Sequence, residues 1–142
     1  MALSREQTIE LLAATRLFAG VDADGLARIA DRISELDVMA QRVIARQGEI
    51  GTGFFIIAAG SVRVIRDGAT LAELGPGDFF GELSVLDGKP RNAQVVSTEP
   101  TTCLALASWD FEAVVRDQPG VALAILRELA GRLRELTEER HH

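Results

Sequence analysis

The sequence predicts a single α+β domain, in which a small antiparallel β-barrel or jelly roll of the double-stranded β-helix type is flanked by helices. Apolar residues first recur at helical spacing, then with a period of two between Gly and Pro turns, and then again at helical spacing. The chain has 142 residues, 47% of them hydrophobic, which is enough for one core. We expect one domain over residues 1–142, with helices in 5–33, a β-roll in 34–107 and C-terminal helices in 109–140.

Two helices are expected before the first strand. The segment REQTIELLAATRLF places Ile9, Leu12 and Leu17 near helical spacing. The next segment, VDADGLARIADRI, has Asp22 or Asp24 as its N-cap. Its apolar residues share one helix face: Leu26, Ile29, Ala30 and Ile33.

The β-roll is predicted from six to eight short strands. The run GFFIIAAG is almost wholly apolar, which is typical of a buried strand, and SVRVIR after it alternates. Asp67-Gly68 is a hairpin turn signal that makes TLAEL the return strand, and a further turn is expected at Gln47-Gly48. Two more strands, NAQVVS and TTCLALA, are separated by Glu99-Pro100.

The C-terminal part is expected to be helical. Ser108 would cap the helix that contains WDFEAVVRD, and a long helix would run from about Gly120 to Arg140. The long helix carries an apolar seam at 4-3-4-3 spacing: Ala122, Leu126, Leu129, Leu133 and Leu136. This seam could pack on the chain's own barrel or form a homodimer through residues 120–136.

Composition disfavours several functions. The formal net charge is −6 without a basic cluster, so we expect no nucleic-acid binding. Cys103 is the only cysteine and the histidines are only His141 and His142, so no metal site or enzyme is expected, and Cys103 should be buried and inert. No apolar run reaches about 18 residues and no signal segment is visible, which predicts a cytoplasmic protein without membrane insertion.

Candidate site chemistry gathers in one turn-rich segment, LGPGDFFGELSVLDGKPRNAQVV. It contains the acid Glu82 and, nine residues later, the base Arg91. Two alternatives are open. The two charges either pair with each other and brace a loop, or each of them holds part of a ligand.

A phosphorylated sugar fits the second alternative. A short helical turn is expected in FFGELSVL, and the N–H groups of Leu83 and Ser84 at its start would form an anion nest. Gly81 would let a ligand approach the backbone, and Arg91 has a forked donor for phosphate oxygens. Because a carboxylate only accepts hydrogen bonds, Glu82 needs a donor such as a ribose hydroxyl.

The motif FGELSVLDGKPRNAQV resembles the phosphate-binding cassette of the cyclic nucleotide-binding domain family, which includes the catabolite activator protein, regulatory subunits of protein kinase A and cyclic-nucleotide-gated channels. RQGEIGTGFFIIAAGSVRV resembles the family's strand pair, and LFAGVDADGLARIA resembles its first helix. The resemblance runs from about Leu17 to Leu136. It implies a cyclic nucleotide receptor or regulatory domain.

The resemblance also implies residue roles. Glu82 would accept from the ribose 2′-hydroxyl, and Arg91 would neutralise the cyclic phosphate. Main-chain N–H groups of Gly81, Leu83 and Ser84 would face the ribose and the phosphate.

Further roles follow from the same resemblance. Asn92 and Ala93 would close the phosphate side, and Thr137 on the last helix would meet the base as a lid residue or be a solvated helix end. The base would be walled by residues that also fit a plain core role: Val64 and either Leu71 or Leu74. Whether cyclic AMP or cyclic GMP binds stays open at Asn92, where the family more often has Ala, Ser or Thr. The absence of Thr there and a composition typical of bacteria favour cyclic AMP.

In such a receptor, ligand binding would shift the last helix and signal to a partner or an attached output. No helix-turn-helix follows this helix, so the sequence suits either a stand-alone receptor or the regulatory part of a larger protein. The alternative is a degenerate fold that acts as a non-binding dimerisation module. The intact Glu82 and Arg91 argue against that alternative.

Overall fold

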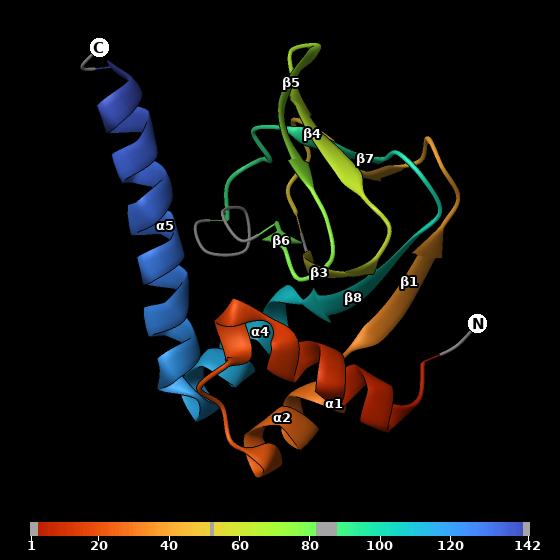
Figure 1. Ribbon diagram of the computed structural model, residues 1–142, viewed down its shortest axis with the longest axis vertical. Coiled ribbons are helices and arrows are strands. Elements are labelled where there is room, and N and C mark those ends of the chain that lie inside the picture. The colour runs from red at the N-terminus through yellow and green to blue at the C-terminus, as the bar shows by residue number, and fades with distance from the viewer. Residues whose placement is uncertain (1–2, 52, 82–87, 141–142) are drawn as a thin grey trace.

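The computed structural model describes residues 3–51, 53–81 and 88–140 of the chain. It shows a β-roll with short helices packed against one side and a long C-terminal helix beside it (Figure 1). The helices are α1 (Arg5–Ala14), the 3₁₀-helix η1 (Arg16–Phe18), α2 (Ala23–Ala30), α4 (Ser108–Asp117) and α5 (Pro119–Arg140). The strands are β1 (Ser34–Val38), β2 (Val43–Ala45), β3 (Gly53–Ala59), β4 (Val62–Arg66), β5 (Ala69–Leu74), β6 (Phe79–Phe80), β7 (Gln94–Ser97) and β8 (Thr101–Ala107).

The strands form two four-stranded antiparallel sheets, with the orders β1-β8-β3-β6 and β2-β7-β4-β5. Consecutive strands β4 and β5 form a hairpin, whereas most other neighbours come from distant parts of the chain. This arrangement is the predicted α+β jelly roll, with helices before and after it in the sequence. The predicted fold class is therefore confirmed.

The predicted hairpin turn has the backbone that its residues favour. Asp67 and Gly68 both have positive φ, of 51° and 83°, as a tight turn between twisted strands requires. The amide of Gln47 donates to the Asp67 carboxylate over 2.9 Å, and the Asp67 N–H donates back to Gln47 over 3.1 Å. The predicted turns at Gln47-Gly48 and Asp67-Gly68 are therefore bonded to each other.

In the sheet β1-β8-β3-β6, strands β3, β6 and β8 are covered on both faces, which explains the almost continuous apolar sequence of β3. Side chains alternate along a strand. In β3, Phe54 and Ile56 point toward the helices, whereas Phe55 and Ile57 point into the roll. The same alternation places Cys103 of β8 inside the roll, fully buried.

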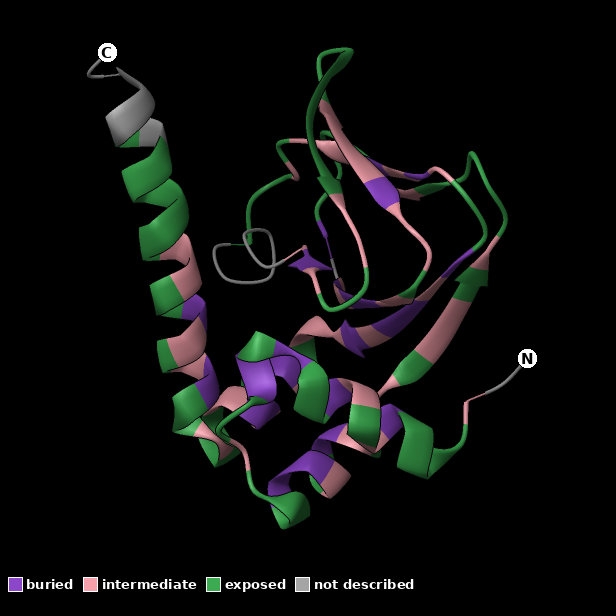
Figure 2. Cartoon of the chain, viewed as in Figure 1, coloured by how far each residue is buried: buried purple, intermediate pink, exposed green. Residues whose placement is uncertain are grey.

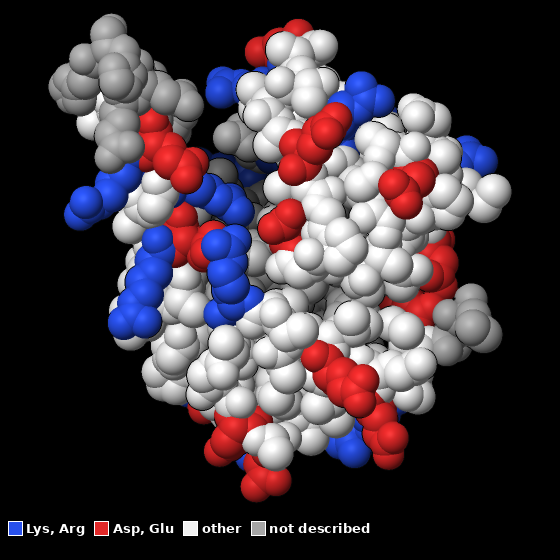
Figure 3. Space-filling model, viewed as in Figure 1, with Lys and Arg blue, Asp and Glu red and all other residues white. Residues whose placement is uncertain are grey.

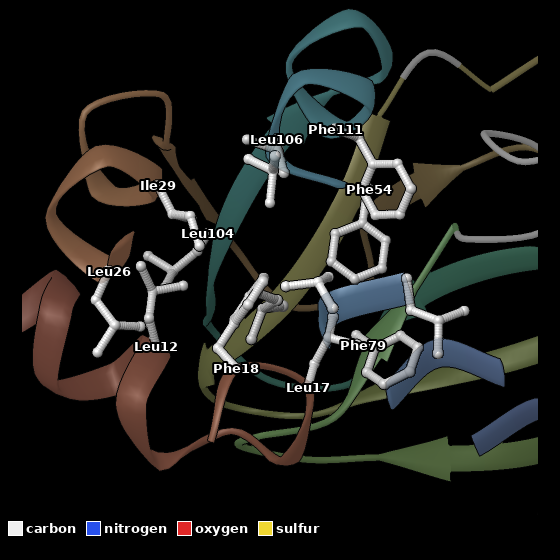
Figure 4. Close-up of a cluster of buried hydrophobic side chains, with 14 residues drawn as sticks. Leu12, Leu17, Phe18, Leu26, Ile29, Phe54, Phe79, Leu104, Leu106 and Phe111 are labelled. Atoms are coloured by element: carbon white, nitrogen blue, oxygen red, sulfur yellow. The ribbon is translucent and has the colours of Figure 1, made fainter. Parts of the chain in front are cut away.

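The helix-facing core, shown in Figure 4, ties the helices to this sheet. Phe54 is at its centre, with ring centroids 5.4 Å from Phe79 and 5.1 Å from Phe111. The buried members of this core are Leu12, Leu17, Phe18, Leu26, Ile29, Phe54, Ile56, Phe79, Leu104, Leu106, Phe111, Val114, Val121 and Ile125. The roll core, on the other face of the sheet, consists of Ala45, Ile57, Val62, Phe80, Val95 and Cys103.

Of the two predicted helix caps, Asp22 is confirmed and Ser108 is not, and Ser4 caps α1 in addition. Ser4 accepts from the Gln7 N–H in a capping box, and Asp22 accepts from the Gly25 N–H over 2.8 Å. The prediction that Ser108 caps α4 is wrong, because β8 continues to Ala107 and that residue occupies the N-cap. Ser108 is the first helical residue instead.

Helix α5 packs through a face that shares Leu129 with the predicted seam but is centred elsewhere. Its buried residues are Val121 and Ile125, with Leu129 partly buried beside them. Leu126 and Leu133, two members of the predicted seam, are 62% and 65% exposed. Among the seam residues whose side chains the structure describes, Leu129 packs on the helix-facing core and these two leucines do not. Residues 130–135 of α5 are exposed, as the green part of the helix in Figure 2 shows.

This difference predicts a large effect on stability for one residue of α5 and almost none for the next residue. Ile125→Ala should lower the free energy of unfolding by about 2–5 kcal/mol, because it leaves a cavity in the helix-facing core. Leu126→Ala should change it by less than about 0.5 kcal/mol, since that side chain is already in water. Urea unfolding at low protein concentration, where contacts between chains do not contribute, measures both. Equal losses would contradict the orientation of α5.

Candidate functional site

The described part of the candidate site includes its two flanks, Gly81 and Arg91. Residues 82–87 lie outside the described residues. The predicted helical turn, the anion nest and the alternative pairing of Glu82 with Arg91 all lie there, together with Leu83 and Ser84. These interpretations stay predictions.

The backbone of Arg91 is fixed by the loop that joins β2 to β3. The Arg91 N–H donates to the Glu49 carbonyl over 2.7 Å, and the Gly48 N–H donates to the Arg91 carbonyl over 2.8 Å. Pro90, directly before Arg91, forms an isolated antiparallel bridge with Ile50. The arginine therefore starts from a backbone held on both its donor and its acceptor side.

The side chain of Arg91 turns back over the start of β3 and is half-buried. Its Nη2 donates to the Gly53 carbonyl over 3.1 Å, and its Cζ lies 6.0 Å from the centre of the Phe55 ring. Gly51 is buried beneath the guanidinium, so closely that a Cβ at that position would overlap it. Both contacts orient the charged group.

Gly81 lies close to the guanidinium of this arginine. Its φ is 92°, a conformation that glycine adopts without strain. A Cβ at Gly81 would lie 2.6 Å from the Gly53 carbonyl oxygen and 3.1 Å from Nη1 of Arg91. The position therefore requires glycine for its backbone conformation and for space.

The predicted base-wall residues divide into two groups. Val64 and Leu74 are half-buried against the roll core. Leu71 is 59% exposed on β5, so it is not a core residue. Next to Arg91, Asn92 is exposed and Ala93 is half-buried.

Thr137, the predicted lid residue, is not brought to the other predicted residues. It is exposed, and its hydroxyl donates to the Leu133 carbonyl one turn earlier over 2.9 Å. The C-terminal end of α5 stands away from the roll (Figure 1). One contact between α5 and the roll is made by Arg132, whose Cζ lies 5.4 Å from the centre of the Phe79 ring.

Sequence reasoning missed the residues that surround Arg91 and the residue that links α5 to the roll. Gly51 and Phe55 lie within the quoted motif RQGEIGTGFFIIAAGSVRV, but nothing in their local pattern shows that an arginine packs on them. Arg132 is one of several charged residues on α5, and its sequence pattern does not show that it contacts Phe79.

Charge and reactivity around the site are modest. On the face shown in Figure 3, basic side chains gather along α5 with acidic side chains between them, and charges of both signs are scattered over the rest of that face. Burial is the main cause that raises the pKa of the Cys103 thiol to about 11, with a smaller contribution from Asp37. Within 3–51, 53–81 and 88–140, no three His, Cys, Asp or Glu side chains gather as a metal site would need. No helix in these ranges is both long and apolar enough to span a bilayer.

Comparison with known proteins identifies the family of this chain. The family model described as "Cyclic nucleotide-binding domain" matches residues 35–118. The match includes the roll, the segment between Gly81 and Arg91, and α4.

Similar proteins include a cyclic AMP receptor protein of Thermus thermophilus, which is 44% identical over 94 residues, or 63% of this chain and 44% of the relative. A cyclic nucleotide-gated potassium channel of Mesorhizobium japonicum is 36% identical over 113 residues, or 80% of this chain and 31% of the relative. The crystal structure of the Thermus thermophilus catabolite activator protein superposes with a TM-score of 0.83 at 36% identity, over 89% of this chain and 62% of that one.

The chain spans less than half the length of these two curated relatives. The matched part nevertheless contains the whole roll and both flanks of the site. The chain belongs to the cyclic nucleotide-binding domain family.

Proposed function

We propose that this domain is a cyclic nucleotide receptor or regulatory domain and that its preferred ligand is cyclic AMP. The observation that carries the proposal is the oriented, half-buried guanidinium of Arg91 beside Gly81, at the position where the family motif places the phosphate. The similar cyclic AMP receptor protein of Thermus thermophilus supports the choice of nucleotide. The proposed role is binding rather than catalysis.

In this proposal each side of the ligand has its own partner. Arg91 neutralises the cyclic phosphate, and the N–H groups of Gly81, Leu83 and Ser84 bind its oxygens and the ribose. Glu82 accepts from the ribose 2′-hydroxyl. Charge-assisted hydrogen bonds of this kind contribute about 1.5–3 kcal/mol each. Several of them with a covered base, less the cost of association, give an affinity near micromolar, or about −8 kcal/mol.

The base is the least constrained part of the ligand. Val64 and Leu74 offer half-buried apolar surface, and Leu71 offers exposed apolar surface on the neighbouring edge strand. Asn92 is exposed beside Arg91, and Ala93 after it is half-buried. In this proposal both residues close the phosphate side. Because no Thr or Ser stands at position 92 to contact a guanine edge, we propose that cyclic AMP binds more tightly than cyclic GMP.

Thermal unfolding with cyclic AMP, cyclic GMP and 5′-AMP tests this function. Cyclic AMP at 100 times its dissociation constant should stabilise the wild type by about 2.7 kcal/mol, which raises Tm by several degrees. Arg91→Ala should abolish the shift and Glu82→Ala should reduce it, while Arg42→Ala, an exposed arginine outside the motif, should leave it unchanged.

Two outcomes would contradict the assignment. A full shift in Arg91→Ala would show that this arginine does not bind the phosphate. No shift with any cyclic nucleotide would support the non-binding module instead.

We propose that α5 carries the signal. Arg132 joins α5 to Phe79, and Phe79 lies two residues before Gly81 in the strand that leads into the site. A ligand that binds better when α5 is docked on the roll would shift the population toward the docked state by that difference in affinity. Helix position would then report ligand occupancy to a partner or an attached output.

Amide hydrogen exchange tests this coupling. Cyclic AMP should increase protection of residues 126–140 in the wild type. Arg132→Gln should lower protection of the same residues before ligand is added, whereas Arg127→Gln, an exposed arginine on the same helix, should not. Unchanged protection on saturation with cyclic AMP would remove α5 from the mechanism.

We further propose that α5 forms a homodimer. Leu123, Leu126 and Leu133 are exposed along the helix, and Trp109 of α4 is 68% exposed. Exposed apolar side chains that recur along a helix are the usual basis of helix pairing between chains.

Analytical ultracentrifugation measures this association. The wild type should sediment as a dimer, and the double variant Leu126→Glu with Leu133→Glu should sediment as a monomer. Leu71→Glu introduces the same charge at a similarly exposed leucine on β5 and should stay dimeric. A monomeric wild type at high concentration would contradict the proposal.

A further inference from the structure

The guanidinium of Arg91 is held by residues from another part of the chain. Gly51 lies beneath it, the Gly53 carbonyl accepts from Nη2, and the Phe55 ring lies 6.0 Å from Cζ. Gly81 approaches Nη1 from the strand that leads into the site. We call Gly51, Gly53, Phe55 and Gly81 the arginine cradle.

Gly51 is the most informative member of the arginine cradle. Its φ is not positive, so its backbone could accept any side chain without strain of that kind. Its Cβ would nevertheless overlap the Arg91 guanidinium. The space above Gly51, rather than a special backbone conformation, therefore requires glycine there.

Phe55 is itself fixed by two neighbours. Its ring stacks on Phe80 with centroids 5.0 Å apart and an interplanar angle of 17°. It also folds back over Gly53, where a Cβ would lie 3.0 Å from the ring edge. Because Phe80 directly precedes Gly81, the ring that faces the guanidinium is packed on the strand that leads into the site.

These contacts settle the position of the arginine before a ligand arrives. A long side chain that is ordered on folding does not lose that conformational freedom on binding, so affinity rises. A guanidinium has five N–H donors in a fixed plane, and a bond to the Gly53 carbonyl sets the direction of that plane.

We propose that Gly51 and Phe55 are positioning residues, which hold the Arg91 guanidinium in the orientation that binds the nucleotide phosphate. The inference rests on the proposed cyclic nucleotide function. It adds that phosphate affinity is set by residues of the β2–β3 loop and β3, outside the segment between Gly81 and Arg91.

Calorimetric titration with cyclic AMP tests Gly51 first. Gly51→Ala should weaken binding by about tenfold or more, because a displaced guanidinium loses a charge-assisted bond. Gly20→Ala is the matched control, since a Cβ there meets nothing within 4 Å. Equal affinities for Gly51→Ala and the wild type would overturn the proposal.

A double-mutant cycle separates positioning from direct contact with the ligand. In an Arg91→Gln background, Gly51→Ala should cause no further loss, because the group that it displaces is gone. A loss of the same size in both backgrounds would mean that Gly51 acts on the nucleotide itself, which would overturn the positioning role.

Phe55 is tested by keeping or removing its ring. Phe55→Leu preserves an apolar side chain without a ring face and should weaken binding about three- to tenfold. Phe55→Tyr keeps the ring and should have an affinity close to that of the wild type. If Phe55→Leu binds cyclic AMP as tightly as the wild type, the ring does not orient Arg91.

The Nε–Hε signal of Arg91 in NMR spectra reports the arginine cradle without a ligand. The signal is assigned by its loss in Arg91→Lys. It should be rigid in the wild type and motionally averaged in Gly51→Ala. If the signal behaves in this way in both proteins while the wild type binds no nucleotide, the proposed function is refuted and the positioning role remains in place. Equal rigidity in both proteins would overturn the positioning role.

Discussion

The structure depends on one sheet, β1-β8-β3-β6, whose strands β3, β6 and β8 are covered on both faces. Apolar side chains on two faces need two covers, and the chain supplies the second sheet for one and the helices for the other. Strand β6 belongs to this sheet, so Phe79 is anchored among the helices and Phe80 inside the roll. The backbone therefore reaches Gly81 from a strand fixed on both sides, and the site begins at a rigid point.

Much of this fold was predictable because the signals are local. Period-two alternation, Asp67-Gly68 and the apolar run of β3 specify strands and turns without reference to distant residues. One alternative was left open and one error was made because the deciding features are not local. Heptad spacing on α5 identified an apolar stripe, but the relative position of helix and roll decided that Val121 and Ile125 would be buried. Ser108 is a good capping residue, but β8 extends far enough to move the cap to Ala107.

The candidate site also contains residues that a local motif predicts and contacts that it does not predict. Gly81 and Arg91 were predictable from a dense linear motif, and the structure brings them together. The residues that orient Arg91 lie 36–40 positions earlier in the sequence, and one of the contacts is to a main-chain carbonyl that no side-chain pattern encodes. Thr137 was predicted from its position along a helix as either a lid residue or part of a solvated helix end, and it is exposed in this structure. The family relationship shown by the comparisons agrees with the motif, and it does not supply those contacts.

The uneven packing of α5 gives it the mechanics of a lever. Its deep contacts end near Ile125 and Leu129, and residues 130–135 are all exposed. At 1.5 Å per residue, the part beyond Ile125 is about 22 Å long. A rotation of about 10° around the anchored end would move the tip by about 4 Å, while the side chains at the pivot would move only slightly. A small rearrangement beside Phe79 could thus become a displacement large enough for another surface to detect.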